Sequence, residues 1–103
     1  MFYVYVLIEK QTGRNYVGYS ADLKTRLTCH REGRGARRTS KGDWALAYYE
    51  AYASKQDAVR REQRLKQNGN ARHQLIERIQ QSIHWMKTGA GEAYDRSTRK
   101  RRP

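Results

Sequence analysis

The stretch NYVGYSADLKTRLTCH, residues 15–30, joins the end of a strand to a helix that carries two polar side chains on one face. Ser20 can cap this helix, which we expect over residues 21–31. Arg26 and His30 stand four positions apart, and residues at that spacing lie on the same helix face. Packing alone would be satisfied by apolar residues there, so the pattern indicates a functional site.

The residues before this stretch are expected to form a hairpin with it. The run FYVYVLIE, residues 2–9, is dense in aromatic and β-branched residues, as strands are, and a polar, glycine-containing turn follows it. If Lys10 pairs with Asn15 across this turn, the side chains of Tyr5 and Tyr16 point to the same face of the sheet. The hairpin would then present two tyrosines beside the helix that carries the arginine and the histidine.

A third strand is predicted by DWALAYYEAY, residues 43–52, with Trp44, Leu46 and Tyr48 on one face. The segment that precedes it, REGRGARRTSKG, has five basic residues against one acid and no apolar period. We expect this segment to be a mobile, cationic loop.

Two helices complete the expected fold. The first is capped by Ser54 and runs to about Gln67, and the second is capped by Asn70 and has apolar residues at helical spacing. The predicted class is α+β, a small three-stranded antiparallel sheet flanked by helices in the order β-β-α-β-α-α. It forms one domain over residues 1–86, and residues 87–103 are expected to be a basic, disordered tail.

Composition limits the class of protein. The chain has 103 residues, a formal charge of +12, a pI near 10.3 and a mean hydropathy of −1.12, which indicate one domain with a small core and a polyanionic partner. No apolar run is long enough to cross a bilayer and no signal peptide is recognisable, so we expect no membrane association. Cys29 is the only cysteine, which excludes an internal disulfide and a cysteine-based zinc site and predicts a cytoplasmic protein.

One acidic residue lies beside the stripe of the helix after Ser54 that is expected to face the core. Glu62 is three residues from both Val59 and Leu65. A buried carboxylate is costly unless it is paired or binds a metal. The alternative is an ordinary surface ion pair with an arginine such as Arg61, and this helix alone leaves both interpretations open.

The motifs taken in order resemble the GIY-YIG nuclease domain. They are YVY at residues 3–5, YVG at residues 16–18, Arg-x-x-x-His on the following helix, and EQRLK at residues 62–66. The chain is similar in particular to small single-domain bacterial proteins of this family whose first motif reads YVY. The resemblance covers roughly residues 2–80.

The resemblance implies the residues of an active site. The implied catalytic residues are Tyr5, Tyr16, Arg26, His30 and Glu62, with Glu62 as the metal ligand and Gly18 as the glycine that closes the second motif. A single carboxylate ligand fits Mg²⁺ or Mn²⁺, which keeps several waters. Arg26 can grip two phosphate oxygens, while Tyr16 is the candidate general base and Tyr5 would orient the water or the phosphate. His30 would share in proton transfer.

Basic side chains on the helix and in the cationic loop surround this set. They are expected to hold the phosphate backbone without reading sequence. The residues concerned are Lys24, Arg31, Arg34, Arg37, Arg38 and Lys41. The alternative is that these charges serve only solubility.

These features predict a metal-dependent endonuclease that hydrolyses phosphodiester bonds in nucleic acid, with DNA favoured over RNA and with low sequence specificity. A structure-specific or single-stranded substrate is compatible with the sequence, and the small size leaves room for a protein partner or a homodimer. The alternative is a nucleic-acid-binding module with the same fold and little or no catalysis. An interaction module for an acidic protein fits the charge but has no specific support.

Overall fold

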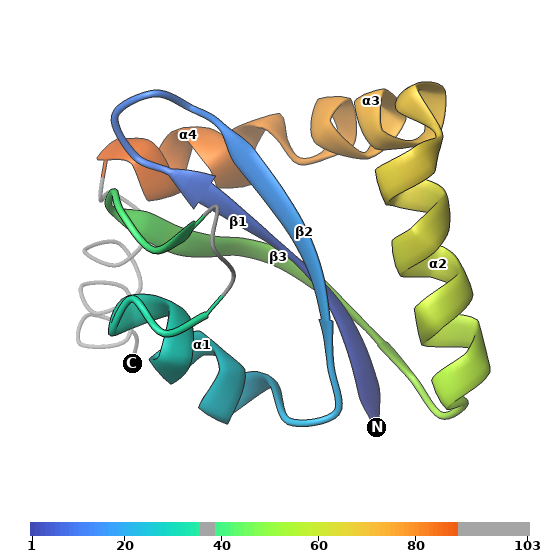
Figure 1. The fold of residues 1–103 in the computed structure, drawn as a ribbon. Helices are drawn as coiled ribbons and strands as arrows, with labels where there is room; N and C mark the ends of the chain where they lie inside the picture. Colours follow the sequence, from blue (N-terminus) through green and yellow to red (C-terminus); the bar gives the residue numbers. More distant parts are fainter. Residues whose placement is uncertain (36–38, 89–103) are drawn as a thin grey trace, which may run out of the picture.

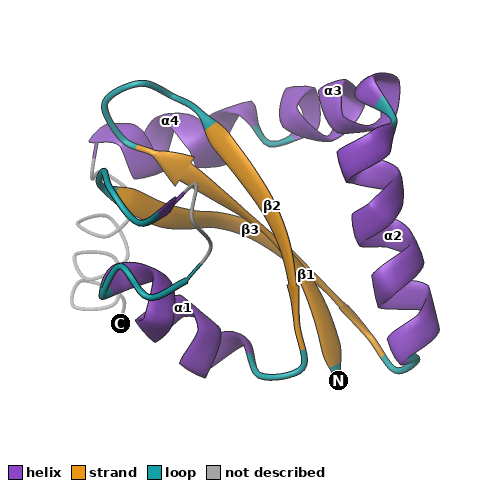
Figure 2. Ribbon diagram, in the orientation of Figure 1, coloured by secondary structure: helices purple, strands orange, loops and turns teal. Residues whose placement is uncertain are grey.

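The computed structural model describes residues 1–35 and 39–88, which form a three-stranded sheet and four helices (Figures 1 and 2). The elements are β1 (Phe2–Glu9), β2 (Asn15–Ser20), α1 (Leu23–Arg31), β3 (Trp44–Tyr52), α2 (Lys55–Gln67), α3 (Gly69–Arg78) and α4 (Gln80–Thr88). The predicted α+β class with a small antiparallel sheet is confirmed. Helix α4 passes the predicted domain boundary at residue 86, and the predicted tail from residue 89 lies outside the described residues. Among the described helices, none has the length and apolar character that crossing a membrane requires.

The sheet has the order β2-β1-β3, so β1 is the central strand. Asn15 pairs with Ile8 and not with Lys10, which moves the hairpin register by two residues from the predicted one. Because side chains alternate with a period of two, a shift of two residues leaves every side chain on its predicted face. Tyr5 and Tyr16 therefore share one face of the sheet, as predicted.

The carboxylate of Glu9 explains the longer turn. Its Oε1 accepts hydrogen bonds from the backbone N–H groups of Gln11 and Thr12 at 3.0 and 2.8 Å. Its Oε2 accepts one from the N–H of Asp43 at 2.8 Å, which ties the turn to the start of β3. These donors, that of Asp43 foremost, lower the pKa of Glu9 to about 2.

A β-bulge interrupts the pairing of β1 with β3. Val6 pairs with Tyr48 and Leu7 pairs with Leu46, so Ala47 is the extra residue. The prediction that Tyr48 shares a sheet face with Leu46 is therefore wrong, because one inserted residue reverses the alternation. Tyr48 instead packs against the hydrophobic core.

The cap of α1 differs from the predicted one. Asp22 caps this helix through Oδ1, which accepts from the Thr25 N–H at 3.2 Å, while the hydroxyl of Ser20 accepts from the Asp22 N–H at 2.9 Å. Gly33 follows the helix with φ +76°, a left-handed conformation that favours glycine after a helix end.

The helices after β3 begin at polar caps. Ser54 caps α2 as predicted, through a bond from the Asp57 N–H at 3.3 Å. Asn68, rather than the predicted Asn70, caps α3 by accepting from the Ala71 N–H at 3.0 Å. The predicted final helix is divided into α3 and α4.

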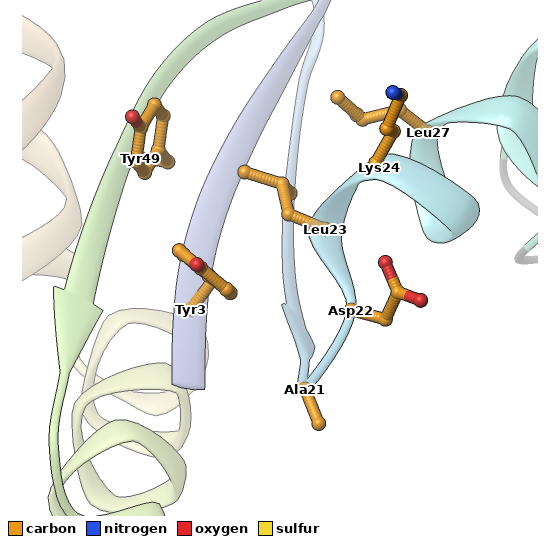
Figure 3. A pocket seen from close by; sticks show the side chains of 7 residues that line it. All are labelled: Tyr3, Ala21, Asp22, Leu23, Lys24, Leu27 and Tyr49. Atoms are coloured by element: carbon orange, nitrogen blue, oxygen red, sulfur yellow. The ribbon is translucent and has the colours of Figure 1, made fainter. Parts of the chain in front are cut away.

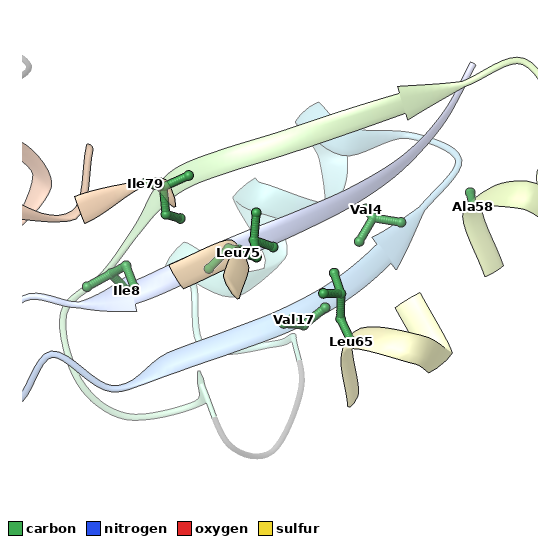
Figure 4. Close-up of a cluster of buried hydrophobic side chains, with 8 residues drawn as sticks. Val4, Ile8, Val17, Ala58, Leu65, Leu75 and Ile79 are labelled. Atoms are coloured by element: carbon green, nitrogen blue, oxygen red, sulfur yellow. The ribbon is translucent and has the colours of Figure 1, made fainter. Parts of the chain in front are cut away.

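One face of the sheet forms the core with α2 and α3, and α1 lies on the other side of the sheet (Figures 1 and 4). The buried core residues are Val4, Val6, Ile8, Val17, Ala58, Leu65, Leu75 and Ile79. The face toward α1 carries Tyr5 and Tyr16 together with the buried Leu7.

Candidate active site

The two motif tyrosines meet on the face of the sheet that α1 covers. The ring centroids of Tyr5 and Tyr16 are 6.4 Å apart, and Tyr5 is completely buried. Gly18 is the register partner of Tyr5, and a Cβ at this glycine would lie 2.4 Å from both the Tyr5 hydroxyl oxygen and its Cζ. The glycine therefore makes room for the Tyr5 ring to lie across β2.

The imidazole of His30 connects these tyrosines to α1. Its Nε2 is 2.9 Å from the Tyr5 hydroxyl and its Nδ1 is 2.7 Å from the Thr39 hydroxyl. The ring also contacts Tyr16, with centroids 5.5 Å apart in an edge arrangement. A Cβ at Gly35 would lie 2.4 Å from Nδ1, so a second glycine gives the imidazole its space.

Arg26 lies close enough to Tyr5 and His30 to affect the protonation of both side chains. Burial raises the pKa of the Tyr5 hydroxyl even though a hydrogen bond from Arg26 opposes this, so Tyr5 is protonated at neutral pH. Burial, followed by the charge of Arg26, lowers the pKa of His30, which is therefore neutral. The Tyr5 hydroxyl shares a hydrogen bond with Nε2 and the Thr39 hydroxyl shares one with Nδ1, so one ring nitrogen of the neutral imidazole donates and the other accepts.

Glu62 reaches the same site from α2. Its Oε2 is 3.0 Å from Lys66 Nζ, and this ammonium group lies 5.4 Å from the Tyr16 ring centroid. The charge of Glu62 also acts on Tyr5, whose pKa it helps to raise. The alternative ion pair of Glu62 with Arg61 does not form, because Arg61 pairs with Glu50 at 2.9 Å.

The carboxylate of Glu62 has the chemistry of a metal ligand, whereas both ring nitrogens of His30 are already hydrogen-bonded. The described residues contain no group of three or more histidine, cysteine, aspartate or glutamate side chains that could hold a metal ion. The Glu62 side chain is 19% exposed, and no hydrogen bond from the described part of the chain reaches its Oε1. One accessible carboxylate oxygen fits a hard cation that keeps several waters, such as Mg²⁺ or Mn²⁺, and does not fit a zinc cage.

Four of the six basic residues predicted to bind nucleic acid belong to the described part of the chain, and all four are exposed. Lys24 is exposed in the first turn of α1 and Arg31 is exposed at its end. Arg34 is also exposed but forms an ion pair with Glu32, and Lys41 is exposed ahead of β3. Arg37 and Arg38 lie outside the described residues.

Three residues of the site carry no role in the sequence-based prediction. Lys66 could have been recognised, because it stands four residues after Glu62 on the same helix. Thr39 and Gly35 come from the glycine-rich, basic segment, which has no periodic pattern to place them. Only the fold shows that this segment returns to His30.

Comparisons with known proteins identify the family of the chain. The family model of the GIY-YIG catalytic domain matches residues 1–75, which include all of the predicted catalytic residues. The chain is 46% identical over 66 residues to a UPF0213 protein of Streptococcus agalactiae serotype V, covering 63% of this chain and 74% of that protein. It is 38% identical over 77 residues to a UPF0213 protein of Halobacterium salinarum, covering 74% of this chain and 99% of that protein. No solved structure matches the chain significantly. The chain therefore belongs to the GIY-YIG catalytic-domain family, a family of nucleases.

Proposed function

We propose that the protein is a metal-dependent endonuclease that hydrolyses phosphodiester bonds in nucleic acid, with DNA favoured over RNA and with low sequence specificity. The observation that carries this proposal is the hydrogen bond of Tyr5 with His30, with Arg26, Tyr16 and the carboxylate of Glu62 close to this pair. A module that only binds nucleic acid would need the surface charge but not this arrangement.

Arg26 is the group that binds the scissile phosphate. It is exposed to solvent, and its interaction with the buried Tyr5 hydroxyl raises the pKa of the guanidinium further. A guanidinium presents paired N–H donors that match two phosphate oxygens and is charged at every physiological pH. Tyr5 and His30 act through Arg26 as positioning residues, because Tyr5 is buried and both ring nitrogens of His30 are engaged.

Tyr16 is the group that takes the proton from the attacking water. Its ring is only half-buried, unlike that of Tyr5, so its hydroxyl is the one that substrate and water can reach. The ammonium group of Lys66 lies beside the Tyr16 ring, and the guanidinium of Arg26 is close enough for an electrostatic interaction with Tyr16. In this position the Tyr16 hydroxyl can accept a proton from a water that attacks the phosphate held by Arg26.

Glu62 would hold the divalent cation, Mg²⁺ or Mn²⁺, through its free carboxylate oxygen. When bound, such an ion polarises a phosphate oxygen and stabilises the leaving oxygen. Lys66 keeps the other carboxylate oxygen oriented, which fixes the direction in which Glu62 presents its ligand. A cytoplasmic location also belongs to the proposal, on the ground of the single cysteine.

The test is cleavage of single-stranded, duplex and branched DNA and of RNA, each with Mg²⁺, Mn²⁺ or EDTA. We expect cleavage of at least one DNA substrate with metal and none with EDTA. Arg26→Ala should abolish cleavage, whereas the control Arg60→Ala on the exposed side of α2 should not. Tight binding of all substrates without cleavage under any of these conditions would favour the non-catalytic binding module instead.

A further inference from the structure

A groove opens beside the candidate active site, between α1 and the same face of the sheet (Figure 3). It has a volume of about 380 Å³, within the range of pockets that take small ring systems. It is lined by Tyr3, Ala21, Asp22, Leu23, Lys24, Leu27 and Tyr49. Its lining is mainly aromatic and aliphatic, with one acid and one base.

Two tyrosines of the sheet line this groove. The rings of Tyr3 and Tyr49 are in edge contact, with centroids 5.9 Å apart and an interplanar angle of 66°. Tyr49 is 52% exposed, and among the described residues only Met1 is also a large hydrophobic side chain with such exposure. The exposed ring of Tyr49 is therefore a surface on which another ring can stack.

The groove lies next to the active site on the same face of the sheet. Tyr49 is the register partner of Tyr5, and Tyr3 is on the same face of β1 two residues away, which is about 7 Å along a strand. Lys24 and Arg26 are two positions apart in α1 and therefore point to different sides of the helix, with Lys24 at the groove. The pairing of Tyr5 with Tyr49 is what places the groove within reach of a nucleotide that neighbours a phosphate bound at Arg26.

The chemistry of the groove suits an uncharged ring better than a phosphate. Both carboxylate oxygens of Asp22 accept hydrogen bonds from Thr25, which lower the pKa of this group and keep it ionised. That negative charge at the rim repels phosphate, while the ammonium group of Lys24 attracts the backbone that flanks a bound base. Aromatic faces accept every base, because each base has a π-face.

From the proposed nuclease function, we infer that this groove binds one unpaired nucleobase next to the scissile phosphate, by stacking on Tyr49 and Tyr3. A base within a duplex is already stacked between its neighbours and cannot enter the groove without leaving them. The groove thus makes single-stranded nucleic acid, or an unpaired nucleotide at a junction or end, the preferred substrate. Each stacked base contributes about 5- to 150-fold in affinity.

The test measures binding by fluorescence anisotropy with EDTA present, so that no cleavage is needed. The probes are a fluorescein-labelled single-stranded oligothymidine, the same strand with one abasic site at successive positions, and a matched duplex. Tyr49→Ala should weaken binding of the single strand by about 5- to 150-fold and leave binding of the duplex unchanged. Tyr49→Phe, which keeps the ring, and the control His73→Ala on exposed α3 should behave as wild type.

The abasic strands identify the base that is bound. At one position along the strand, removal of the base should weaken binding by the wild-type protein. Removal of the same base should not further weaken binding by Tyr49→Ala. The inference is overturned if Tyr49→Ala binds the single strand as wild type does, or weakens both probes equally. It is also overturned if Tyr49→Ala changes only the oligomeric state in sedimentation, since the groove would then join copies of the chain. A protein that shows the predicted binding pattern but does not cleave with metal would refute the nuclease proposal and retain the groove.

Discussion

Replacing Gly18 by alanine tests the contact on which the active site depends. The added Cβ would lie 2.4 Å from the Tyr5 hydroxyl oxygen and Cζ, so the ring must move. Gly18 does not have a positive φ, so alanine suits the backbone and the effect comes from the ring contact alone. Overpacking costs about 1–3 kcal/mol, and loss of the Tyr5–His30 hydrogen bond adds about 1 kcal/mol.

We therefore expect Gly18→Ala to lower the free energy of unfolding by about 2–4 kcal/mol, measured by urea denaturation. In a domain of this size that corresponds to a fall in Tm of roughly 10–30 °C. Gly69→Ala is the matched control, because nothing lies within 4 Å of a Cβ at that position. Gly69→Ala should raise the free energy of unfolding by about 0.4–1 kcal/mol.

A double-mutant cycle assigns the cost to the ring. In a Tyr5→Leu background the ring that clashes with the new Cβ is gone, so Gly18→Ala should cost less than about 1 kcal/mol. The reasoning is refuted if Gly18→Ala costs the same in both backgrounds, or if it is as harmless as Gly69→Ala.

Two further predictions concern a proton acceptor and an acid-sensitive turn. Tyr16→Phe should leave the free energy of unfolding unchanged and reduce the cleavage rate by about 10²- to 10⁴-fold, because only the hydroxyl is lost; wild-type cleavage would remove Tyr16 from the mechanism. The pKa of Glu9 is about 2 in the fold against an ordinary 4.5, so its contribution to stability is complete above pH 4.5 and is lost as the pH falls toward 2. In Glu9→Gln the urea concentration at the unfolding midpoint should depend less on pH over this range than it does in wild type. Glu77→Gln, which changes an exposed residue, should show the same pH dependence as wild type.

Local sequence patterns predict most of the fold, because the strand, turn and helix preferences of the residues agree with the final structure. Aromatic and β-branched residues fix the strands, and alternation alone places Tyr5 and Tyr16 on one face even though the register is two residues from the predicted one. The two-residue shift of the hairpin register was not predictable from local patterns, because it depends on the Glu9 carboxylate. This carboxylate accepts a hydrogen bond from the backbone N–H of Asp43, which is distant in the sequence. The bulge at Ala47 likewise carries no signal in the strand pattern.

The residues of the candidate site were likewise predicted only in part. Motif spacing identifies Tyr5, Arg26 and Glu62, which the fold brings together. The partners of these residues come from tertiary packing, and Thr39 is the clearest case, since a polar loop has no periodicity that predicts its hydrogen bond to His30. Glu62 shows the limit of helix patterns, which place it at the edge of the core but cannot choose its ion-pair partner.

The central claim is that Glu62 supplies the metal-binding carboxylate of a phosphodiesterase site. The most direct measurement is the single-turnover cleavage rate of Glu62→Gln against Glu77→Gln, with Mg²⁺ or Mn²⁺ in excess and equal amounts of folded protein. The substitution keeps the size of the side chain and removes its charge, so the account predicts cleavage at background for Glu62→Gln and at the wild-type rate for Glu77→Gln. Metal-dependent cleavage by Glu62→Gln at the wild-type rate would contradict it.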